Sequence, residues 1–222
     1  MSRWRPEVVA VRIEADRIDG AGITEPIGSD AAEAWRRWAG RTSLRRGTRL
    51  RVTVSDHRTR YWLCSPPAGL AGFAELRAVA AARFEDLFHV PAGDWALDGD
   101  WHATQPFLCA AMPAVLHAAV CATADEHGWR LKALQPASVA DFNGMDLGGR
   151  APTWALSFRD DGFNALLLDG GRPRDVCQHW TDEPPDTAGV LTRLRAQALV
   201  ARAEMPTRFV TAGPAPRLGT SP

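Results

Sequence analysis

Alternating apolar and polar residues in the first half of the chain predict strands, and apolar residues three and four apart predict helices. The stretch "EVVAVRIEA" at 7–15 alternates and is rich in β-branched residues, so we expect a strand there. "SDAAEAWRRWAG" at 29–40 predicts a short helix, capped by Ser29 or Asp30, with Trp35 and Trp38 on one face. The next expected elements are a hairpin of strands at 49–56 and 60–67, a helix at 71–90, a strand pair or irregular turn at 94–103, a strand at 106–112, a helix from Pro113 to His127, and a strand from 130 that breaks at Pro136.

The pattern begins again after the polar, glycine-rich segment "GMDLGGRAP" at 144–152, which we interpret as a linker. Three short strands follow, then a helix at 186–204 capped by Asp186 and a last strand at 207–213. The three strands are expected at 153–160, 163–169 and 174–180, with tight turns between them. The whole chain therefore predicts a mixed α/β protein with two related lobes, at 1–143 and 153–213, and a disordered tail at 214–222.

Composition narrows the function classes. The formal net charge is zero, with 26 basic and 26 acidic residues, which argues against a protein-wide affinity for nucleic acid or anionic lipid. No apolar run reaches the roughly 18–20 residues that a membrane helix needs, and the N-terminus lacks an apolar signal core. We expect a cytoplasmic protein.

Metal and thiol chemistry find little support in the sequence. The four cysteines (Cys64, Cys109, Cys121 and Cys177) stand in apolar surroundings without a CxxC pair, so buried reduced thiols are expected rather than disulfides or a zinc site. Three aspartates and a histidine cluster in "GDWALDGDWH", but they lack the spacing of a calcium loop, which favours a solvated turn. We expect no metal and no other cofactor.

An arginine-rich stretch is the main candidate for a binding surface. Nine arginines crowd residues 36–60, where Asp56 is the only acid. Guanidinium groups bind carboxylates and phosphates, so this stretch predicts a docking patch for an acidic partner or lipid headgroups; the alternative is a solvated face. The residues expected to bind a partner are Arg36, Arg37, Arg41, Arg45, Arg46, Arg49 and Trp4. A nucleic-acid surface is less favoured, because Trp35 and Trp38, which could stack on bases, are expected to be buried.

Two longer passages resemble a known family. "RLRVTVSDHRTRYWLCSPPAGLAGFAELRAVAAARFEDLF" contains a strand, a second strand that ends in proline, and an alanine-rich helix with acidic and aromatic residues. "PFLCAAMPAVLHAAVCATADEHGWRLKALQPASVADFN" continues with a strand, a helix, a glycine and a short strand into "QPASVA". In this order the passages resemble the cytoplasmic domain of the type II secretion protein GspL and the related type IV pilus protein PilM, over about residues 49–143 and more loosely 153–212.

The resemblance implies an α/β fold of two ribonuclease-H-like, or actin-like, lobes with mixed sheets flanked by helices. It also implies a scaffolding role at the cytoplasmic base of a pilus or secretion machine. PilM binds ATP and a peptide of an inner-membrane partner, whereas GspL continues into a membrane helix. The partners implied here are inner-membrane or cytoplasmic assembly proteins, through which this chain would associate with the membrane.

Nucleotide binding in the actin-like fold needs one phosphate-binding hairpin in each lobe, with Asp, Gly and a small hydroxyl residue. In the first lobe that turn holds Asp16, Arg17 and Ile18, so bulky side chains are expected where phosphates would lie. In the second lobe it reads Asp160-Asp161-Gly162-Phe163, where a second acid would repel phosphate and Phe163 replaces the hydroxyl. Both sequences predict that the ATP site has been lost, as in a pseudo-ATPase.

The segment Asp169-Gly170-Gly171 has the letters of a phosphate loop, but it lies one hairpin later and is followed by Arg172-Pro173 rather than Ser or Thr. Asp-Gly between apolar runs is a strong hairpin signal, because glycine adopts positive φ readily. We expect an ordinary turn here.

Three function hypotheses remain open from the sequence. The first is a non-catalytic scaffold or adaptor of a type IV pilus or type II secretion type of assembly. The second is an ATP-binding, actin-like switch protein with divergent phosphate loops. A remnant of a ribonuclease-H-like nuclease is the least favoured, because the first strand offers only Glu14 where several metal-binding carboxylates are needed, and no G-x-S-x-G sequence suggests a hydrolase. We expect the protein not to be an enzyme.

Overall fold

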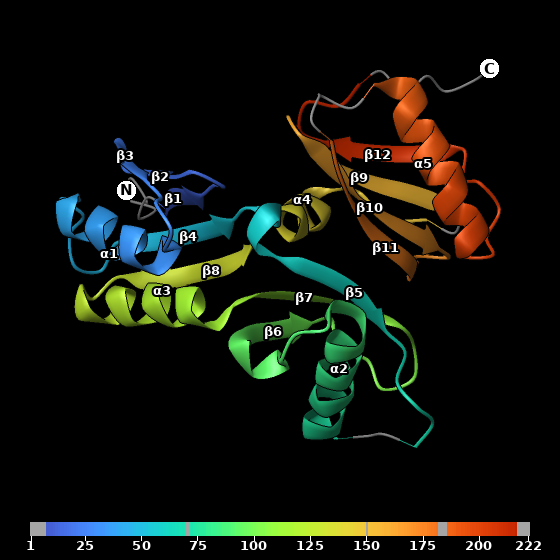
Figure 1. Cartoon of the computed structure of the whole chain (residues 1–222), viewed down its shortest axis with the longest axis horizontal. Coiled ribbons are helices and arrows are strands. Elements are labelled where there is room, and N and C mark those ends of the chain that lie inside the picture. The colour runs from blue at the N-terminus through green and yellow to red at the C-terminus, as the bar shows by residue number, and fades with distance from the viewer. Residues whose placement is uncertain (1–7, 70–71, 150, 182–185, 217–222) are drawn as a thin grey trace, which may run out of the picture. The chain divides into compact units, whose positions relative to one another are not determined.

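A computed structural model describes residues 8–69, 72–149, 151–181 and 186–216, which fall into two units (Figure 1). Unit 1 holds the residues up to Arg60 together with Val90–Leu97 and Ala111–Ala137. Unit 2 holds Tyr61–His89, Asp98–Ala110 and the residues from Ser138 onward. Each unit is built around its own sheet and core, as described in turn below.

The sheet of unit 1 has the strand order β3-β2-β1-β4-β8. Its first three strands form an antiparallel meander, and the last two lie parallel to the first. The strands are β1 (Val8–Ile13), β2 (Arg17–Gly20), β3 (Ile23–Pro26), β4 (Arg49–Val54) and β8 (Arg130–Pro136). The sequence pattern predicted β1 but missed β2 and β3, because two four-residue strands are too short to show alternation. A turn in which Ala21 and Gly22 both have positive φ joins them.

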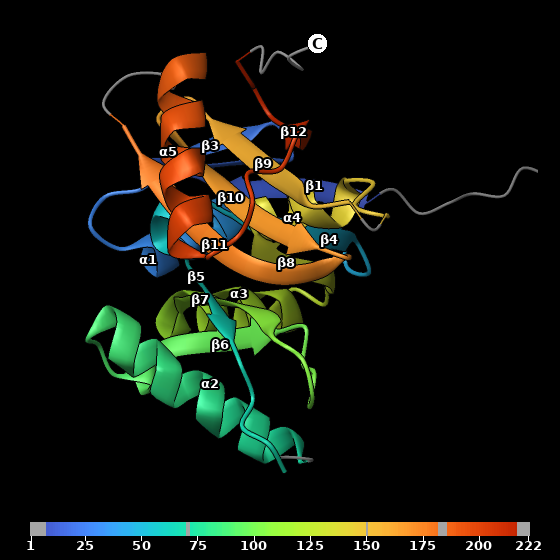
Figure 2. The same ribbon diagram turned by 90° about the vertical axis from the view of Figure 1, so that its right-hand side faces the viewer.

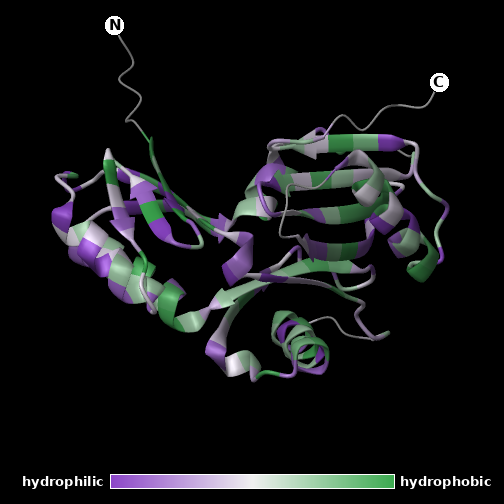
Figure 3. Cartoon of the chain, turned by 45° about the horizontal axis from the view of Figure 1, so that its top comes forward, coloured by the Kyte–Doolittle hydropathy of each residue, from purple (hydrophilic) through white to green (hydrophobic). Residues whose placement is uncertain are grey.

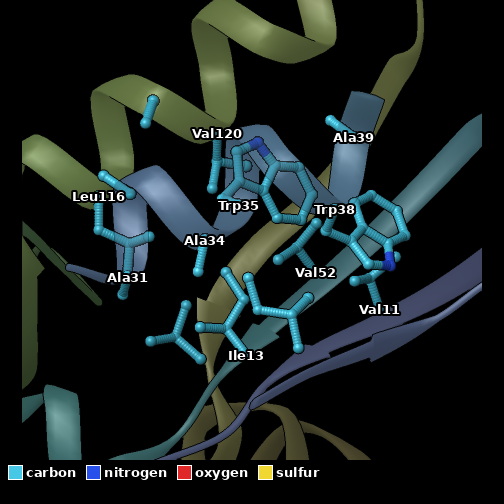
Figure 4. Packing of buried hydrophobic residues seen from close by; sticks show 14 of the residues in the cluster. Val11, Ile13, Ala31, Ala34, Trp35, Trp38, Ala39, Val52, Leu116 and Val120 are labelled. Atoms are coloured by element: carbon cyan, nitrogen blue, oxygen red, sulfur yellow. The ribbon is translucent and has the colours of Figure 1, made fainter. Parts of the chain in front are cut away.

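Helices α1 (Ala31–Arg41) and α3 (Ala114–Glu126) pack against this sheet and against each other (Figure 4). Asp30, one of the two caps that the sequence allowed, caps α1 by accepting hydrogen bonds from the backbone of Ala32 and Glu33. Trp35 and Trp38 are fully buried, with their ring centroids 4.9 Å apart. Such a stacked pair excludes a large apolar area from water, so it is a principal source of stability in unit 1.

The sheet of unit 2 has the order β11-β10-β9-β12 and repeats the topology of unit 1. Three antiparallel strands, a helix and a strand parallel to the first follow one another in both units. These elements are β9 (Thr153–Arg159), β10 (Gly162–Asp169), β11 (Arg172–Trp180), α5 (Thr187–Val200) and β12 (Arg208–Ala212). The strands, the helix and its Asp186 cap all lie where the sequence predicted them.

Both faces of this second sheet are covered. Helix α5 crosses one face (Figure 2), where Val190 and Leu194 pack against Trp154 and Leu156 of β9. The other face carries Ala155, Leu166 and Leu168, which pack with Phe142 and Leu108. Every residue of β9 from Thr153 to Phe158, and every residue of β10 from Gly162 to Leu168, is buried as a result.

A three-stranded sheet of order β5-β7-β6 supplies part of that cover. Its elements are β5 (Arg60–Cys64), β6 (Trp95–Gly99) and β7 (Phe107–Pro113); residues 61–64, 98–99 and 107–110 of them belong to unit 2. Helix α2 (Phe73–Phe88) packs on this sheet through rings of Trp62 and Phe84 whose centroids are 5.2 Å apart. The short helix α4 (Ala137–Gly144) was not predicted; it contributes Phe142 to the same core.

The predicted hairpin of strands at 49–56 and 60–67 is wrong. Strands β4 and β5 lie in different sheets, joined by a 3-10 turn at Asp56–Arg58, in which Asp56 is buried. The division into units also differs from the lobes expected at 1–143 and 153–213, because residues 61–89 and 98–110 group with the second sheet. Of the expected tail at 214–222, only 214–216 are described.

We expect Trp38→Ala to lower the free energy of unfolding of unit 1 by about 3–5 kcal/mol, because it removes a buried ring and leaves a cavity beside Trp35. Arg36→Ala on the exposed side of the same helix is the control and should change it by less than about 0.5 kcal/mol. Denaturant unfolding followed by tryptophan fluorescence measures both. Similar losses in the two variants would contradict this account of the core.

Candidate functional site

The β1–β2 turn occupies the place of the first expected phosphate-binding hairpin, and it consists of Glu14, Ala15 and Asp16 without a glycine. The guanidinium of Arg58 donates hydrogen bonds to the backbone oxygens of Glu14, at 3.2 Å, and Ala15, at 2.6 Å. The backbone N–H of Glu14 donates to the carbonyl of Arg17 across the turn. The turn is therefore held by an internal cation, and its tip carries carboxylates instead of the hydroxyl residue of a phosphate loop.

The prediction that Ile18 fills a phosphate space is wrong. Ile18 lies on β2 opposite Ile13, and its side chain is fully buried in the core of unit 1. Arg17 is exposed and pairs with Asp19 at 2.8 Å and with Asp16 at 3.3 Å. The hairpin differs from a phosphate loop through its missing glycine and hydroxyl and its acidic tip, not through an intruding Ile18.

The β9–β10 turn, the second expected phosphate-binding hairpin, consists of Asp160 and Asp161. Gly162 is already part of β10, and a Cβ atom there would lie 2.2 Å from the backbone oxygen of His179. This glycine therefore permits close approach of β11. Phe163 does not stand in the turn as expected; its ring is buried in the core beneath α5, 5.5 Å from that of Phe158. Two neighbouring aspartates at the turn disfavour a bound phosphate through charge repulsion.

The segment Asp169-Gly170-Gly171 is an ordinary hairpin turn, which confirms the sequence interpretation. Asp169 and Arg172 pair as the last residues of β10 and the first of β11, and the two glycines form the turn between them. Both have positive φ, 59° and 76°, as a type I′ turn requires. This turn carries no feature that calls for a phosphate.

Two of the candidate arginines are engaged inside unit 1. Glu25 on β3 is only 6% exposed, and its two carboxylate oxygens accept hydrogen bonds from Arg37, at 2.8 Å, and Arg41, at 2.6 Å. Hydrogen bonds from Arg37, and then from Arg41, lower the pKa of Glu25 against the opposing effect of burial. These two arginines therefore tie α1 to the β-meander.

The other candidate arginines differ in exposure. Arg36 and Arg45 are exposed, and no ion pair is recorded for either within the described ranges; the outer side of α1 is hydrophilic in Figure 3. Arg46 is also exposed, and its stem lies over Gly128, where a Cβ would come within 2.7 Å of its Cγ. Arg49 is half-buried, and its Nε is buried without a hydrogen-bond partner in the part of the chain that the structure describes. The expected contact Trp4 lies outside the described residues.

Unit 2 contains a groove of about 700 Å³, which we call the β5–β11 groove. It is lined by one strand of the three-stranded sheet, by helix α2 and by one strand of the four-stranded sheet. Its residues are Tyr61–Ser65, Val79, Arg83, Leu87, Phe88, Pro106 and Pro173–Val176. No sequence pattern indicated this groove, because these segments are separated along the chain; the prolines that follow β5 and begin β11 were its only local signal.

A polar cluster that the sequence analysis also missed joins α4 to the second sheet. Asp141 accepts hydrogen bonds from Ser157, at 2.6 Å, and Arg159, at 2.9 Å. The side-chain amide nitrogen of Asn164 donates to Ser138 at 2.7 Å, while its side-chain oxygen is buried without a hydrogen-bond partner among the described residues. Residues 16 to 26 positions apart are brought together here, a spacing from which no local pattern could reveal the cluster.

Among the residues that the structure describes, no group of three His, Cys, Asp or Glu side chains is placed to hold a metal ion. Asp98 accepts hydrogen bonds from the Trp101 indole, at 3.0 Å, and from the backbone of Gly99. All four cysteines are free, and burial raises the pKa of Cys177 to about 12, which makes it a poor nucleophile.

Solved structures of low sequence identity share this fold. A Bacteroides thetaiotaomicron protein described as having an actin-like ATPase fold and unknown function matches with a TM-score of 0.57 and 8% identity, over 98% of this chain and 96% of that one. The chain has the actin-like fold. The cytoplasmic domain of EpsL, an inner membrane component of the type II secretion system of Vibrio cholerae, matches with a TM-score of 0.56 and 12% identity, over 96% of this chain and 85% of that one.

A third match is the PilM–PilN type IV pilus biogenesis complex, with a TM-score of 0.52 and 14% identity over 90% of this chain and 67% of the matched chain. The fold expected from the resemblance to GspL and PilM is thus confirmed. No family model matches the sequence, and neither does any curated protein. Within the described residues, none of the helices has the length and apolarity to span a membrane.

We expect Glu25→Gln to destabilise the protein at neutral pH and to do so less in acid. The folded state lowers the pKa of Glu25, so its ion pairs stabilise the protein above the unfolded carboxyl pKa of about 4.3 and are lost as pH falls through the folded pKa. Urea unfolding of both proteins at pH 7 and pH 3 measures the difference.

The control for this pH dependence is Glu33→Gln, since Glu33 pairs with Arg37 at 3.1 Å but its side chain is 65% exposed. Exposed pairs contribute little, so this variant should unfold like wild type at both pH values. A difference for Glu25→Gln that does not change with pH would contradict the assigned role of its charge.

Because neither hairpin has the features of a phosphate loop, we expect millimolar Mg-ATP to leave the melting temperature unchanged. A ligand a hundredfold above its dissociation constant would stabilise the folded state by about 2.7 kcal/mol, which differential scanning fluorimetry detects easily. Mg-ADP and Mg-GTP serve as comparisons. An upward shift that depends on ATP concentration would favour the ATP-binding switch instead.

Proposed function

We propose that this chain is a non-catalytic cytoplasmic scaffold, or adaptor, of a type IV pilus or type II secretion type of assembly, and that it binds other assembly proteins. One observation carries the proposal. The fold that matches the EpsL cytoplasmic domain and PilM is kept over nine tenths or more of the chain, while both hairpins lack the glycine and hydroxyl pattern for phosphate.

The chemistry of the described residues supports a non-catalytic role. The two acidic turns would repel a phosphate through like charge, and the turn in unit 1 is held by Arg58 rather than by a ligand. The most strongly shifted thiols, Cys109 and Cys177, have pKa values raised by burial, which makes them less reactive. A protein of this kind can still bind other proteins through its surface.

The partner surface that we propose in unit 1 is its arginine face, made of Arg36, Arg45 and Arg46 with the neighbouring Arg37, Arg41 and Arg49. The first three are exposed, so they can bind carboxylates of an acidic partner. Arg37 and Arg41 place α1 through Glu25, whose carboxylate offsets part of their charge. Trp4 remains a further candidate contact.

A protein partner fits this face better than nucleic acid does. Trp35 and Trp38, the aromatic residues next to the arginines, are fully buried and cannot stack on bases. The formal net charge of zero gives no protein-wide attraction to phosphate backbones. Association with the inner membrane would then come through partner proteins.

Cross-linking in the native cell, followed by mass spectrometry, tests the proposal. We expect inner-membrane or cytoplasmic pilus or secretion assembly proteins to be captured. Arg36→Glu/Arg45→Glu should reduce their capture at least about tenfold, because charge reversal replaces attraction with repulsion.

The matched control, Arg77→Glu/Arg195→Glu, makes the same change in net charge on exposed positions of α2 and α5 and should capture as wild type does. Recovery of metabolic enzymes alone would refute the scaffold function. Equal capture by both charge variants would instead show that the partner binds somewhere other than the arginine face.

A further inference from the structure

The β5–β11 groove, with its volume of about 700 Å³, falls within the size range of ligand sites. We propose that it binds an extended, acidic segment of a partner protein, which adds as a strand to the edge of β5 with its carboxylates at Arg83 and Arg174. This inference rests on the proposed function, since it names the class of segment that such a scaffold would hold.

Hydrophobic packing fixes the strands that line the groove. Leu63 of β5 and Val176 of β11 pack against one hydrophobic cluster with Leu108, Leu166 and Leu168. Trp62, the preceding residue of β5, packs on Phe84 and Phe88 of α2. Because β5 is fixed by this packing, its edge is preorganised, which lowers the cost of ordering a bound segment.

Strand β5 ends its sheet and has a hydrogen-bonded strand, β7, on one side only within the described part of the chain (Figure 1). An outer strand edge presents backbone N–H and C=O groups to an incoming strand, which is how extended peptides dock by strand addition. Leu63–Ser65 line the groove along this edge. A polar backbone edge beside apolar side chains fits an extended peptide better than a flat apolar ligand.

Strand β11, on the opposite wall, is poorly suited to pair with an added strand. Pro173 lacks an N–H, and the register with β10 shifts between Leu167 and Leu168, so that Arg174 has no partner residue on β10. Such a bulge re-aims a side chain and interrupts the ladder. We therefore assign strand addition to β5 and assign to β11 the placing of the Arg174 side chain.

The charges of the groove select an acidic segment. Arg83 is exposed on α2, and among the described residues no ion pair is recorded for it. Arg174 pairs with Asp169 at 3.5 Å, but both side chains are about half exposed, so the pair is weak and easily exchanged. Asp175, the one acid among the described residues that line the groove, accepts a hydrogen bond from Gln197 of α5 and is already engaged.

The probe for this site is a phage-displayed library of random peptides of about 10 residues, one strand in length, selected on the whole chain. We expect enriched sequences that alternate apolar and acidic residues without a central proline, since proline would remove a ladder N–H. No enrichment, or enrichment of basic or proline-rich sequences, would overturn the proposal.

A synthetic copy of the strongest acidic peptide is then titrated by fluorescence anisotropy. Arg83→Glu and Arg174→Glu should each weaken its binding at least about tenfold, and Arg195→Glu, on an exposed turn of α5, should leave it within about twofold. Hydrogen exchange should slow along Trp62–Cys64. Unchanged binding in both groove variants, or protection elsewhere, would overturn the site.

The outcome separates this site from the proposed function. If cross-linking still captures assembly proteins while no acidic peptide binds, the scaffold stands and the groove is not its docking site. If light scattering shows a dimer whose β5 amides are protected without peptide, the groove is filled by a second copy and the proposal fails. If cross-linking captures no assembly protein and no acidic peptide binds, the function and the site are overturned together.

Discussion

The burial of both faces of β9 and β10 is the constraint on which unit 2 depends. One face is covered by α5, and the other packs with Leu63, Leu108 and Phe142. A strand covered on both sides cannot alternate apolar and polar residues, which explains the nearly continuous apolar run "NALLLD" in β10. The same packing fixes Leu63 and Val176, and it thereby sets the walls of the β5–β11 groove.

Local signals in the sequence located the elements well where they were long or sharply punctuated. The Asp30 and Asp186 caps, the Gly170-Gly171 turn and the strands of the second meander lie as predicted, since each depends on adjacent residues. The β4–β5 hairpin failed because two neighbouring strands can enter different sheets, and that choice is made by tertiary packing. The groove could not be predicted, since no local pattern pairs α2 with β11.

In the candidate site, too, local features could be predicted from the sequence, whereas contacts between distant residues could not. The acidic, glycine-poor turns could be read directly, but the side-chain directions could not: Ile18 and Phe163 turn into cores rather than toward a ligand. Likewise the arginine stretch was visible as composition, while its internal partner Glu25 lies 12 and 16 residues from Arg37 and Arg41. A cluster of arginines in a sequence thus indicates a binding surface only once the buried acids that pair with some of them are known.

The β1–β2 turn has one further consequence. Its carbonyl groups are satisfied by the guanidinium of Arg58, a group that the chain carries permanently. A turn closed in this way is completed by the chain itself and needs no metabolite to satisfy these two carbonyl groups. Under the proposed scaffold function, the timing of assembly would follow the supply of partner proteins and not the energy status of the cell.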